Sequence, residues 1–231
     1  MGKRAQIQPQ GPNKQQGSNK QRPFHLEWKN SSQKLAYMTF EQHDALFLVG
    51  PAGTAKTHLA VAFAISEIIN KKRKRIVLTR PMVEAGGEKL GFLPGTFEEK
   101  INPYLLPIFD CMDIIVGRET PDRERINKSI DIVPMAYLRG RTFHDSICIL
   151  DEAQNANEEQ LKLFMTRLGL NSKMIITGDP TQSDLRGDGA FGRVVQAMKD
   201  GIHGIGVVEF NEACIVRHEL VAKILAAWPA K

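Results

Sequence analysis

The chain of 231 residues has the length of one globular domain, and its 42% hydrophobic and 25% charged residues are typical of a soluble protein. No apolar run approaches the roughly 18 residues that a membrane-spanning helix needs, and the N-terminus lacks the apolar core of a signal peptide. The three cysteines are isolated, which leaves a zinc site or a disulfide framework without support. These features predict a cytoplasmic protein without membrane association.

The net charge of +5 is concentrated at the N-terminus. Residues 1–30 carry six Lys and Arg side chains against one acid, Glu27, so the rest of the chain is neutral overall. Residues 1–22 contain almost no core-forming side chains, which predicts a disordered basic tail. The tail could be a loose electrostatic arm for RNA or DNA, or only a solubilising extension. A second basic cluster, Lys71–Arg75, could contact phosphates or form a solvated loop.

From Ser31 onward, short apolar runs alternate with amphipathic stretches, which indicates a parallel α/β sheet. The expected strands are residues 45–49, 75–79, 146–150, 173–177 and 204–210. Helical spacing is present over residues 56–72, 158–168 and 218–228. In the first of these helices, Leu59, Phe63 and Ile69 could share a buried face. We therefore expect one α/β domain over residues 23–231.

Residues 81–145 interrupt this alternation. The segment begins with a stretch dense in Gly and Pro and becomes helical around Phe97–Met112. A connection of this length between strands is more often functional than structural. We interpret it as an inserted segment that could form a lid, a partner surface or a substrate clamp.

A near match to the phosphate-loop pattern G-x-x-x-x-G-K-[ST] lies in "LFLVGPAGTAKTHLAVAFAI", residues 46–65. A buried strand ends at Val49 and a helix begins near residue 55, so backbone N–H groups and the positive helix end meet at one point. Lys56 would reach the β- and γ-phosphates, and Thr57 would offer its hydroxyl to Mg²⁺. The residues expected to surround the phosphates are Gly50, Pro51, Ala52, Gly53, Thr54, Ala55, Lys56, Thr57 and His58.

Ala55 stands where the pattern has its second glycine. We expect the residue before Lys56 to have entered helical backbone angles, which alanine favours, and the unusual angles to fall on Gly50 and Gly53. On this interpretation nucleotide binding is retained. The methyl group of Ala55 could still crowd a phosphate, so hydrolysis could be weak.

A pair of carboxylates follows another buried strand in "SICILDEAQNA". In P-loop enzymes a strand-end Asp holds Mg²⁺ through water and a neighbouring Glu polarises the attacking water, and Asp151 and Glu152 fit these roles. The alternative is an acidic helix N-terminus with no catalytic role. Because the loop and the pair each follow a buried strand, together they indicate a P-loop NTPase.

A third element, "MIITGDPTQSDL", again places polar residues after a strand. Asp179 and Gln182 are candidates for detecting the γ-phosphate. Ordinary turn chemistry in "GDPTQ" is the competing explanation.

In this order, these elements resemble the PhoH family, the phosphate-starvation-inducible proteins. The resemblance covers roughly Ser31–Trp228 and is most specific in two blocks, "LTRPMVEAGGEKLGFLPGTFEEKINPYLLP" and "YLRGRTFHDSICILDEAQNA". It implies a three-layer, RecA-like P-loop NTPase core with a mainly parallel central sheet, related to superfamily-1 helicases. Ala55 departs from the glycine that the family usually has.

The resemblance also implies roles for individual residues. Gln33 would lie by the adenine, Gln182 would sense the γ-phosphate, and Arg217 would reach a phosphate within the chain or across a subunit boundary. Residues 79–81 would meet nucleic acid. Arg139 and Arg141 are further candidates, although fold-stabilising pairs explain them equally well. A single RecA-like core needs a partner surface to complete its site. We therefore expect a ring of subunits, with a hexamer as the expected form.

The first hypothesis is an Mg²⁺-dependent ATPase in an oligomeric ring, coupled to RNA or single-stranded DNA. The second is a protein that binds ATP or ADP as a switch, hydrolyses it negligibly and acts through protein partners. A small-molecule kinase is a third and weaker reading, because no acceptor pocket is evident. Some family members carry a nuclease domain, for which we find neither room nor a separate carboxylate cluster.

Overall fold

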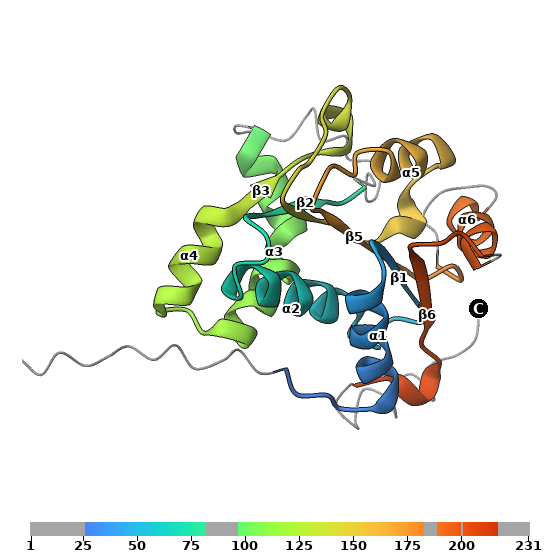
Figure 1. The fold of residues 1–231 in the computed structure, drawn as a ribbon, viewed down its shortest axis with the longest axis horizontal. Coiled ribbons are helices and arrows are strands. Elements are labelled where there is room, and N and C mark those ends of the chain that lie inside the picture. The colour runs from blue at the N-terminus through green and yellow to red at the C-terminus, as the bar shows by residue number, and fades with distance from the viewer. Residues whose placement is uncertain (1–25, 82–96, 183–188, 200, 217–231) are drawn as a thin grey trace, which may run out of the picture.

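The computed structural model describes residues 26–81, 97–182, 189–199 and 201–216, with residues 97–105 described by their backbone alone (Figure 1). The basic tail, the helix expected at residues 218–228 and Arg217 lie outside the described residues. Among the helices of the described ranges, none combines the length and the apolar character that crossing a bilayer requires.

The centre of the fold is a six-stranded sheet in the order β3-β2-β4-β5-β1-β6, and every neighbouring pair is parallel. Its strands are β1 (Ala45–Val49), β2 (Arg75–Thr79), β3 (Ile130–Ile132), β4 (Ser146–Leu150), β5 (Lys173–Gly178) and β6 (Ile205–Glu209). Five of these strands form at the predicted places. The predicted α/β class with a mainly parallel sheet is confirmed.

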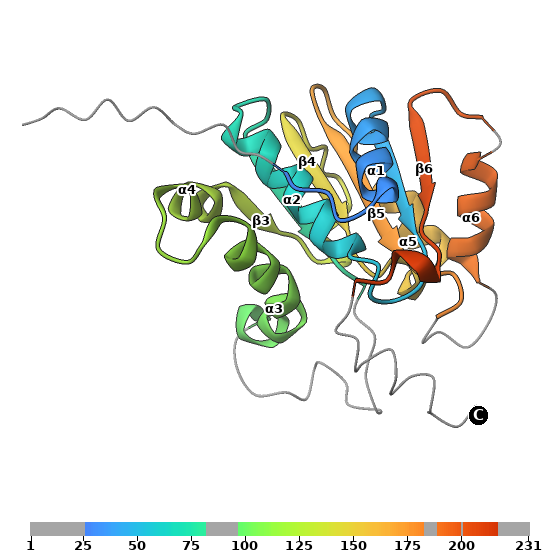
Figure 2. The ribbon, with the colours of Figure 1, turned by 90° about the horizontal axis from the view of Figure 1, so that it is seen from below.

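Helices cover both faces of the sheet, as Figure 2 shows. One face carries α1 (Ser31–Gln42), α2 (Lys56–Ile69), α3 (Phe97–Val116) and α4 (Pro121–Ser129), and the other carries α5 (Glu158–Met165) and α6 (Ala190–Lys199). Strand β1 alternates between the two cores: Leu46 and Leu48 belong to the first, and Phe47 and Val49 to the second. Because β1 is buried on both faces, it is continuously apolar.

The helix after the phosphate loop, α2, is buried on all sides from Leu59 to Ile68, and not only along one face. Leu59 and Phe63 are buried as expected, while Ile69 is half-buried. Strands on one side and helices α1, α3 and α4 on the others account for this burial. The start of α2 is therefore fixed by tertiary packing as well as by local sequence.

Helix α1 was not predicted from the pattern. Its N-cap is Asn30, whose side chain accepts a hydrogen bond from the Gln33 backbone N–H. At its other end the buried Lys173 ammonium donates to the backbone carbonyls of Phe40, Glu41 and His43. A lysine from β5 thus satisfies carbonyls that the helix itself leaves without donors.

The segment over residues 81–145 returns to the sheet before it ends. Strand β3 pairs with β2 at the edge of the sheet, and the short 3₁₀ helix η3 (Met135–Leu138) packs into the second core. A strand of three residues is too short for its alternation to be read from sequence. Part of the expected insertion therefore belongs to the sheet.

The order of the strands decides which residues meet. Strand β5 lies between β1 and β4, so the loop after β1 and the carboxylates after β4 are separated by one strand tip. In open parallel sheets ligands bind at the carboxyl ends of the strands. The phosphate loop, the acidic pair and the turn after β5 all lie at that edge.

The basic cluster Lys71–Arg75 lies at the amino ends of the strands, opposite the phosphate loop, because it precedes and begins β2. Its charges are largely paired: Lys72 with Glu41 and Glu67, Arg73 with Glu67, and Lys74 with Asp145. The structure therefore favours the interpretation as a solvated loop, with its charges largely in ion pairs, over a phosphate-contacting surface.

Candidate functional site

The phosphate loop connects β1 to α2 and contains three residues with positive φ. Gly50 and Gly53 have φ values of 151° and 85°, as predicted for glycines. Ala55 also has left-handed angles, with φ 67° and ψ 26°, so the expectation that it has already entered helical angles is wrong. The helix starts only at Lys56, and the preceding residue must still turn the chain. This conformation costs a residue with a Cβ roughly 1–2 kcal/mol.

The loop is closed by its own side chains. The Lys56 ammonium donates to the backbone carbonyls of Gly50 at 2.7 Å and Pro51 at 2.9 Å. The buried Thr54 hydroxyl donates to the Pro51 carbonyl at 2.9 Å. The two bonds of Lys56 hold its ammonium against the first residues of the loop, which the sequence pattern expects to bind phosphates.

Thr57 and Asp151 meet directly. The Thr57 hydroxyl donates to Oδ1 of Asp151 at 2.7 Å, and the Thr177 hydroxyl, from β5, donates to the same oxygen at 2.6 Å. Asp151 is 2% exposed, and its backbone N–H donates to the Thr79 carbonyl. Thr57 and Asp151, the two residues predicted to hold the metal, are therefore in contact. Thr177 of β5, the strand between β1 and β4, bonds to the same Asp151 oxygen.

Glu152 is held in an unusual position. It has left-handed angles, with φ 56° and ψ 44°, and its carboxylate lies 3.5 Å from the Arg80 guanidinium. The Gln154 amide donates to Oε2 of Glu152 at 2.5 Å, and the Gln154 amide oxygen accepts from the Asp179 backbone N–H at 3.1 Å. A chain of contacts thus joins the acidic pair to the turn after β5. Strain of this kind is concentrated at functional sites.

Gln33 of α1 and His58 of α2 both interact with Lys29, which precedes α1. Gln33 is 3% exposed, and its amide oxygen accepts from the Lys29 backbone N–H at 2.9 Å. Burial, together with the positive charge of Lys29, lowers the pKa of His58 below its usual 6.5. Gln33 and His58, predicted separately, are thus both linked to Lys29 beside the start of α2.

The remaining predicted residues are not all brought to this centre. Gln182 is exposed, and its backbone N–H donates to the Asp179 carbonyl at 3.1 Å. Thr79 is buried and donates its hydroxyl to the Val133 carbonyl, while Pro81 is also buried. Of residues 79–81, implied to meet nucleic acid, two are therefore buried, and the third, Arg80, faces the acidic pair.

The two arginines of "YLRGRT" differ in their surroundings. Arg141 pairs with Asp131 at 2.8 Å and lies over the Phe143 ring, with 4.8 Å from its guanidinium carbon to the ring centre. Arg139 is exposed. The fold-stabilising interpretation therefore holds for Arg141.

Three further residues belong to this site by geometry: Lys29, Gln154 and Thr177. Each contacts or electrically influences a predicted residue, and none carries a motif that identifies it alone. The signal for Gln154 is its place directly after the acidic pair in "DEAQ", and for Thr177 its place at the end of a strand. Both signals are common in ordinary sheet proteins.

The donor set fits Mg²⁺. The Thr57 hydroxyl and the Asp151 carboxylate are hard oxygen ligands at hydrogen-bond distance, next to a loop suited to phosphates. Among the described residues, no group of three or more His, Cys, Asp or Glu side chains could enclose an ion. That arrangement suits magnesium, which commonly takes one or two protein ligands together with water and substrate phosphates.

Comparison with known proteins gives one clear family. A model described as PhoH-like protein matches residues 25–229. The PhoH-like protein of Bacillus subtilis is 47% identical over 201 residues, which cover 87% of this chain and 63% of that protein. Protein PhoH of Escherichia coli is 38% identical over 210 residues, covering 87% of this chain and 57% of that protein. The chain thus spans about three fifths of the length of these relatives.

Solved structures resemble the chain more distantly. A Bacteroides Pif1 bound to single-stranded DNA is 16% identical, with a TM-score of 0.38, and the match covers 87% of this chain and 46% of that one. A SWI2/SNF2 ATPase core of Sulfolobus solfataricus in complex with double-stranded DNA is also 16% identical, with a TM-score of 0.41, covering 64% and 30%. Similarities of this size do not bear on what the chain does.

Proposed function

Because the chain belongs to the PhoH-like protein family, we propose that it is an Mg²⁺-dependent ATPase that acts as an oligomer on RNA or single-stranded DNA. The observation that carries the proposal is the 2.7 Å hydrogen bond between Thr57, next to the loop lysine, and Asp151 of the acidic pair. The lysine, the metal-binding oxygens and the catalytic carboxylate of an ATPase must converge at one triphosphate.

Each residue has a defined task in this proposal. Lys56 binds the β- and γ-phosphates, while Thr57 and Asp151 hold the magnesium ion, which neutralises charge that develops on the phosphates. Glu152 accepts a proton from the attacking water. Gln182 and Arg217 contact the γ-phosphate, and Gln33 and His58 lie on the side that would take the adenine.

The contacts of Glu152 support its role as a general base. The Gln154 amide fixes one carboxylate oxygen, which leaves the other turned toward Arg80. A base that is held by one hydrogen bond keeps its orientation when water binds. Gln154 also bonds to the backbone of the β5 turn, so the same contact could transmit γ-phosphate binding from that turn to Glu152.

Two substitutions separate binding from chemistry. Lys56→Ala should weaken ATP binding by about 100-fold, since it removes charge-assisted hydrogen bonds to phosphate. Lys74→Ala, at the opposite edge of the sheet, is the matched control and should bind normally. Glu152→Gln should bind ATP and release no phosphate, while Glu159→Gln on the surface of α5 should hydrolyse normally. Unchanged turnover in Glu152→Gln would remove that residue from its role.

A nucleotide switch with negligible hydrolysis is the second candidate, and the backbone of Ala55 favours it. A left-handed alanine immediately before Lys56 stores strain beside the phosphates. Phosphate release should be measured with no nucleic acid, with an RNA oligonucleotide and with single-stranded DNA. Stimulation by a nucleic acid supports the ATPase. Nucleotide binding without release under all three conditions supports the switch.

The oligomeric ring is the part of the proposal that concerns the surface completing the nucleotide site. It rests on the single RecA-like core that the described residues form, whose nucleotide site a surface of a neighbouring subunit would complete. Sedimentation velocity with and without ATP and magnesium tests it directly. A monomer under all conditions would reject the ring and leave the nucleotide site unaffected.

A further inference from the structure

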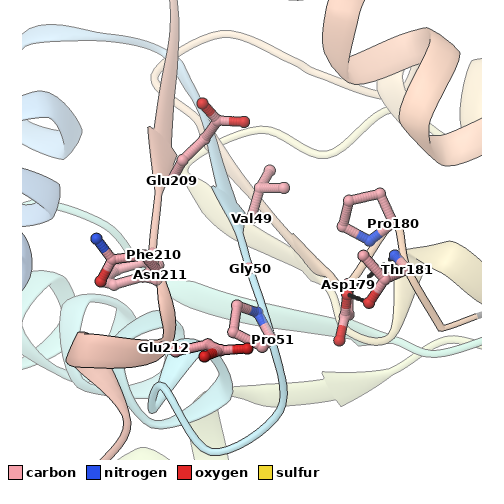
Figure 3. Close-up of a pocket in the computed structure, with 10 residues that line it drawn as sticks. All are labelled: Val49, Gly50, Pro51, Asp179, Pro180, Thr181, Glu209, Phe210, Asn211 and Glu212. Atoms are coloured by element: carbon pink, nitrogen blue, oxygen red, sulfur yellow. Dashed lines mark hydrogen bonds between the residues drawn. The ribbon is translucent and has the colours of Figure 1, made fainter.

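A pocket of about 370 Å³ lies beside the phosphate loop, at the carboxyl ends of β1, β5 and β6 (Figure 3). Gly50 and Pro51 form one wall, residues 179–181 a second, and residues 209–212 a third. Among the described residues, Asp179, Glu209 and Glu212 are the only ionisable ones that line it, so every formal charge on this part of the lining is negative. An anion would be repelled from this pocket, and a cation would be attracted.

One carboxylate oxygen in the pocket, Oδ2 of Asp179, lacks a hydrogen-bond donor among the described residues. Asp179 is 3% exposed; its Oδ1 accepts hydrogen bonds from the Thr181 backbone N–H at 3.0 Å and from the Thr181 hydroxyl at 2.7 Å. Its Oδ2 is buried and has no hydrogen-bond partner. A buried acceptor without a partner is costly. A ligand that supplies an N–H group would satisfy this oxygen.

The other two carboxylates differ from each other. Glu209 already pairs with Lys199 at 2.6 Å, and Figure 3 shows its side chain turned away from Pro51. The Glu212 carboxylate is turned toward Pro51, and no Lys or Arg among the described residues pairs with it. Asp179 and Glu212 are thus the unmatched charges of the pocket.

A basic side chain matches this lining better than a metal ion. Within the described parts of the chain, no three acidic, His or Cys side chains lie close enough to enclose an ion. A guanidinium or ammonium group supplies several N–H donors and can satisfy acceptors that lie apart. The apolar surfaces of Pro51, Pro180 and Phe210 suit the methylene stem of such a side chain.

The chain itself contains a segment rich in basic side chains. Residues 1–22 contain Lys3, Arg4, Lys14, Lys20 and Arg22 and no acid. The first described residue, Leu26, packs against the apolar cluster that contains Phe210, one wall of the pocket. A fully extended chain spans at most about 3.5 Å per residue. A segment of this length can therefore reach the pocket on its own chain or on a second copy.

We propose that this acidic pocket binds Lys or Arg side chains of the basic N-terminal segment, residues 1–22. Because Gly50 and Pro51 form a wall of the pocket and also accept hydrogen bonds from Lys56, the bound segment lies next to the phosphate site. Its binding requires no nucleotide, so it is independent of the proposed ATPase activity.

The test uses the full chain with its five tail Lys and Arg residues replaced by Gln, which removes competition from its own tail. A fluorescein-labelled peptide of residues 2–22 is titrated with this protein, without nucleotide, and followed by anisotropy. We expect saturable binding that Asp179→Asn weakens about tenfold and Glu212→Gln by at least about threefold. Glu158→Gln, an exposed acid on another face, should bind as before.

Three outcomes would overturn the proposal. They are no binding, equal binding by Glu212→Gln and Glu158→Gln, or equal binding of a peptide whose Lys and Arg residues are replaced by Gln. Glu212 is exposed, so its variant keeps the experiment decisive even if Asp179→Asn fails to fold. Because the assay measures peptide binding without nucleotide, a loss of ATP hydrolysis in any variant does not affect its outcome.

Discussion

The hydroxyl of Thr57 donates a 2.7 Å hydrogen bond to the carboxylate of Asp151, although the two residues are 94 positions apart in the chain. The bond joins the first turn of α2 to the end of β4, across the tip of β5. It brings the phosphate loop and the acidic pair into one site.

Thr177→Val should leave the fold intact and loosen Asp151. The substitution removes one of two hydroxyl donors to the Asp151 carboxylate and preserves the shape of the side chain. We expect a loss of about 1 kcal/mol in the free energy of unfolding, with magnesium-dependent ATP binding weakened more than magnesium-free binding. Urea denaturation and calorimetric titration measure the two effects. Thr166→Val, on the exposed end of α5, should change neither.

Ala55→Gly should stabilise the protein. Glycine adopts the left-handed angles of this position without the steric cost that an alanine bears, and we expect a gain of about 1 kcal/mol. For a chain of this size that corresponds to a rise of roughly 2–4 °C in melting temperature. Ala60→Gly, a buried helical position in α2, should instead lose about 1 kcal/mol or more. A lower melting temperature for Ala55→Gly would show that the strain is absent.

Gly50→Ala should displace the start of the phosphate loop. A Cβ at this position would lie 2.4 Å from the Phe210 carbonyl oxygen and 2.9 Å from the Phe210 Cβ. Overpacking of this kind costs about 1–3 kcal/mol, and nucleotide affinity should fall with it. Gly140→Ala carries the strain of positive φ without any clash, and Gly189→Ala meets neither obstacle. Unfolding free energies should therefore fall most for Gly50→Ala, less for Gly140→Ala and hardly for Gly189→Ala.

His58 should make the fold less stable in mild acid. Burial and the charge of Lys29 lower its pKa in the folded chain, so below pH 6.5 the unfolded chain takes up a proton that the folded chain resists. The contribution of His58 to stability is present above pH 6.5 and is lost as the pH falls through the folded pKa. Urea denaturation at pH 7 and pH 5 should show a smaller loss for His58→Gln than for the native chain.

A titration of the His58 imidazole by NMR provides the direct check. Lys29→Gln should move its pKa back toward 6.5, because one of its two causes is removed. A native pKa at or above 6.5 would contradict the pH prediction, whatever the denaturation data show.

The sequence alone determined the outline of the fold. Short apolar runs placed β1, β2, β4, β5 and β6 correctly, and the two strand-end motifs located the phosphate loop and the acidic pair. Strand β3 and helix α1 escaped prediction for a physical reason. The strand has three residues. In α1 the buried residues include the polar Gln33, while Leu35 and Met38 are exposed, so its apolar residues do not mark one face.

Only the tertiary structure decided the details of the site. The left-handed angles of Ala55 depend on where α2 begins, which is set by packing around the helix and not by the helix propensity of alanine. The hydrogen bonds of Thr177 to Asp151 and of Gln154 to Asp179 depend on β5 lying between β1 and β4. Local periodicity reports which side of a strand is buried, but the order of strands in a sheet is a property of contacts between distant segments. For that reason the sequence predicted that the two motifs share one magnesium-bound triphosphate, and it could not predict the contacts through which they meet.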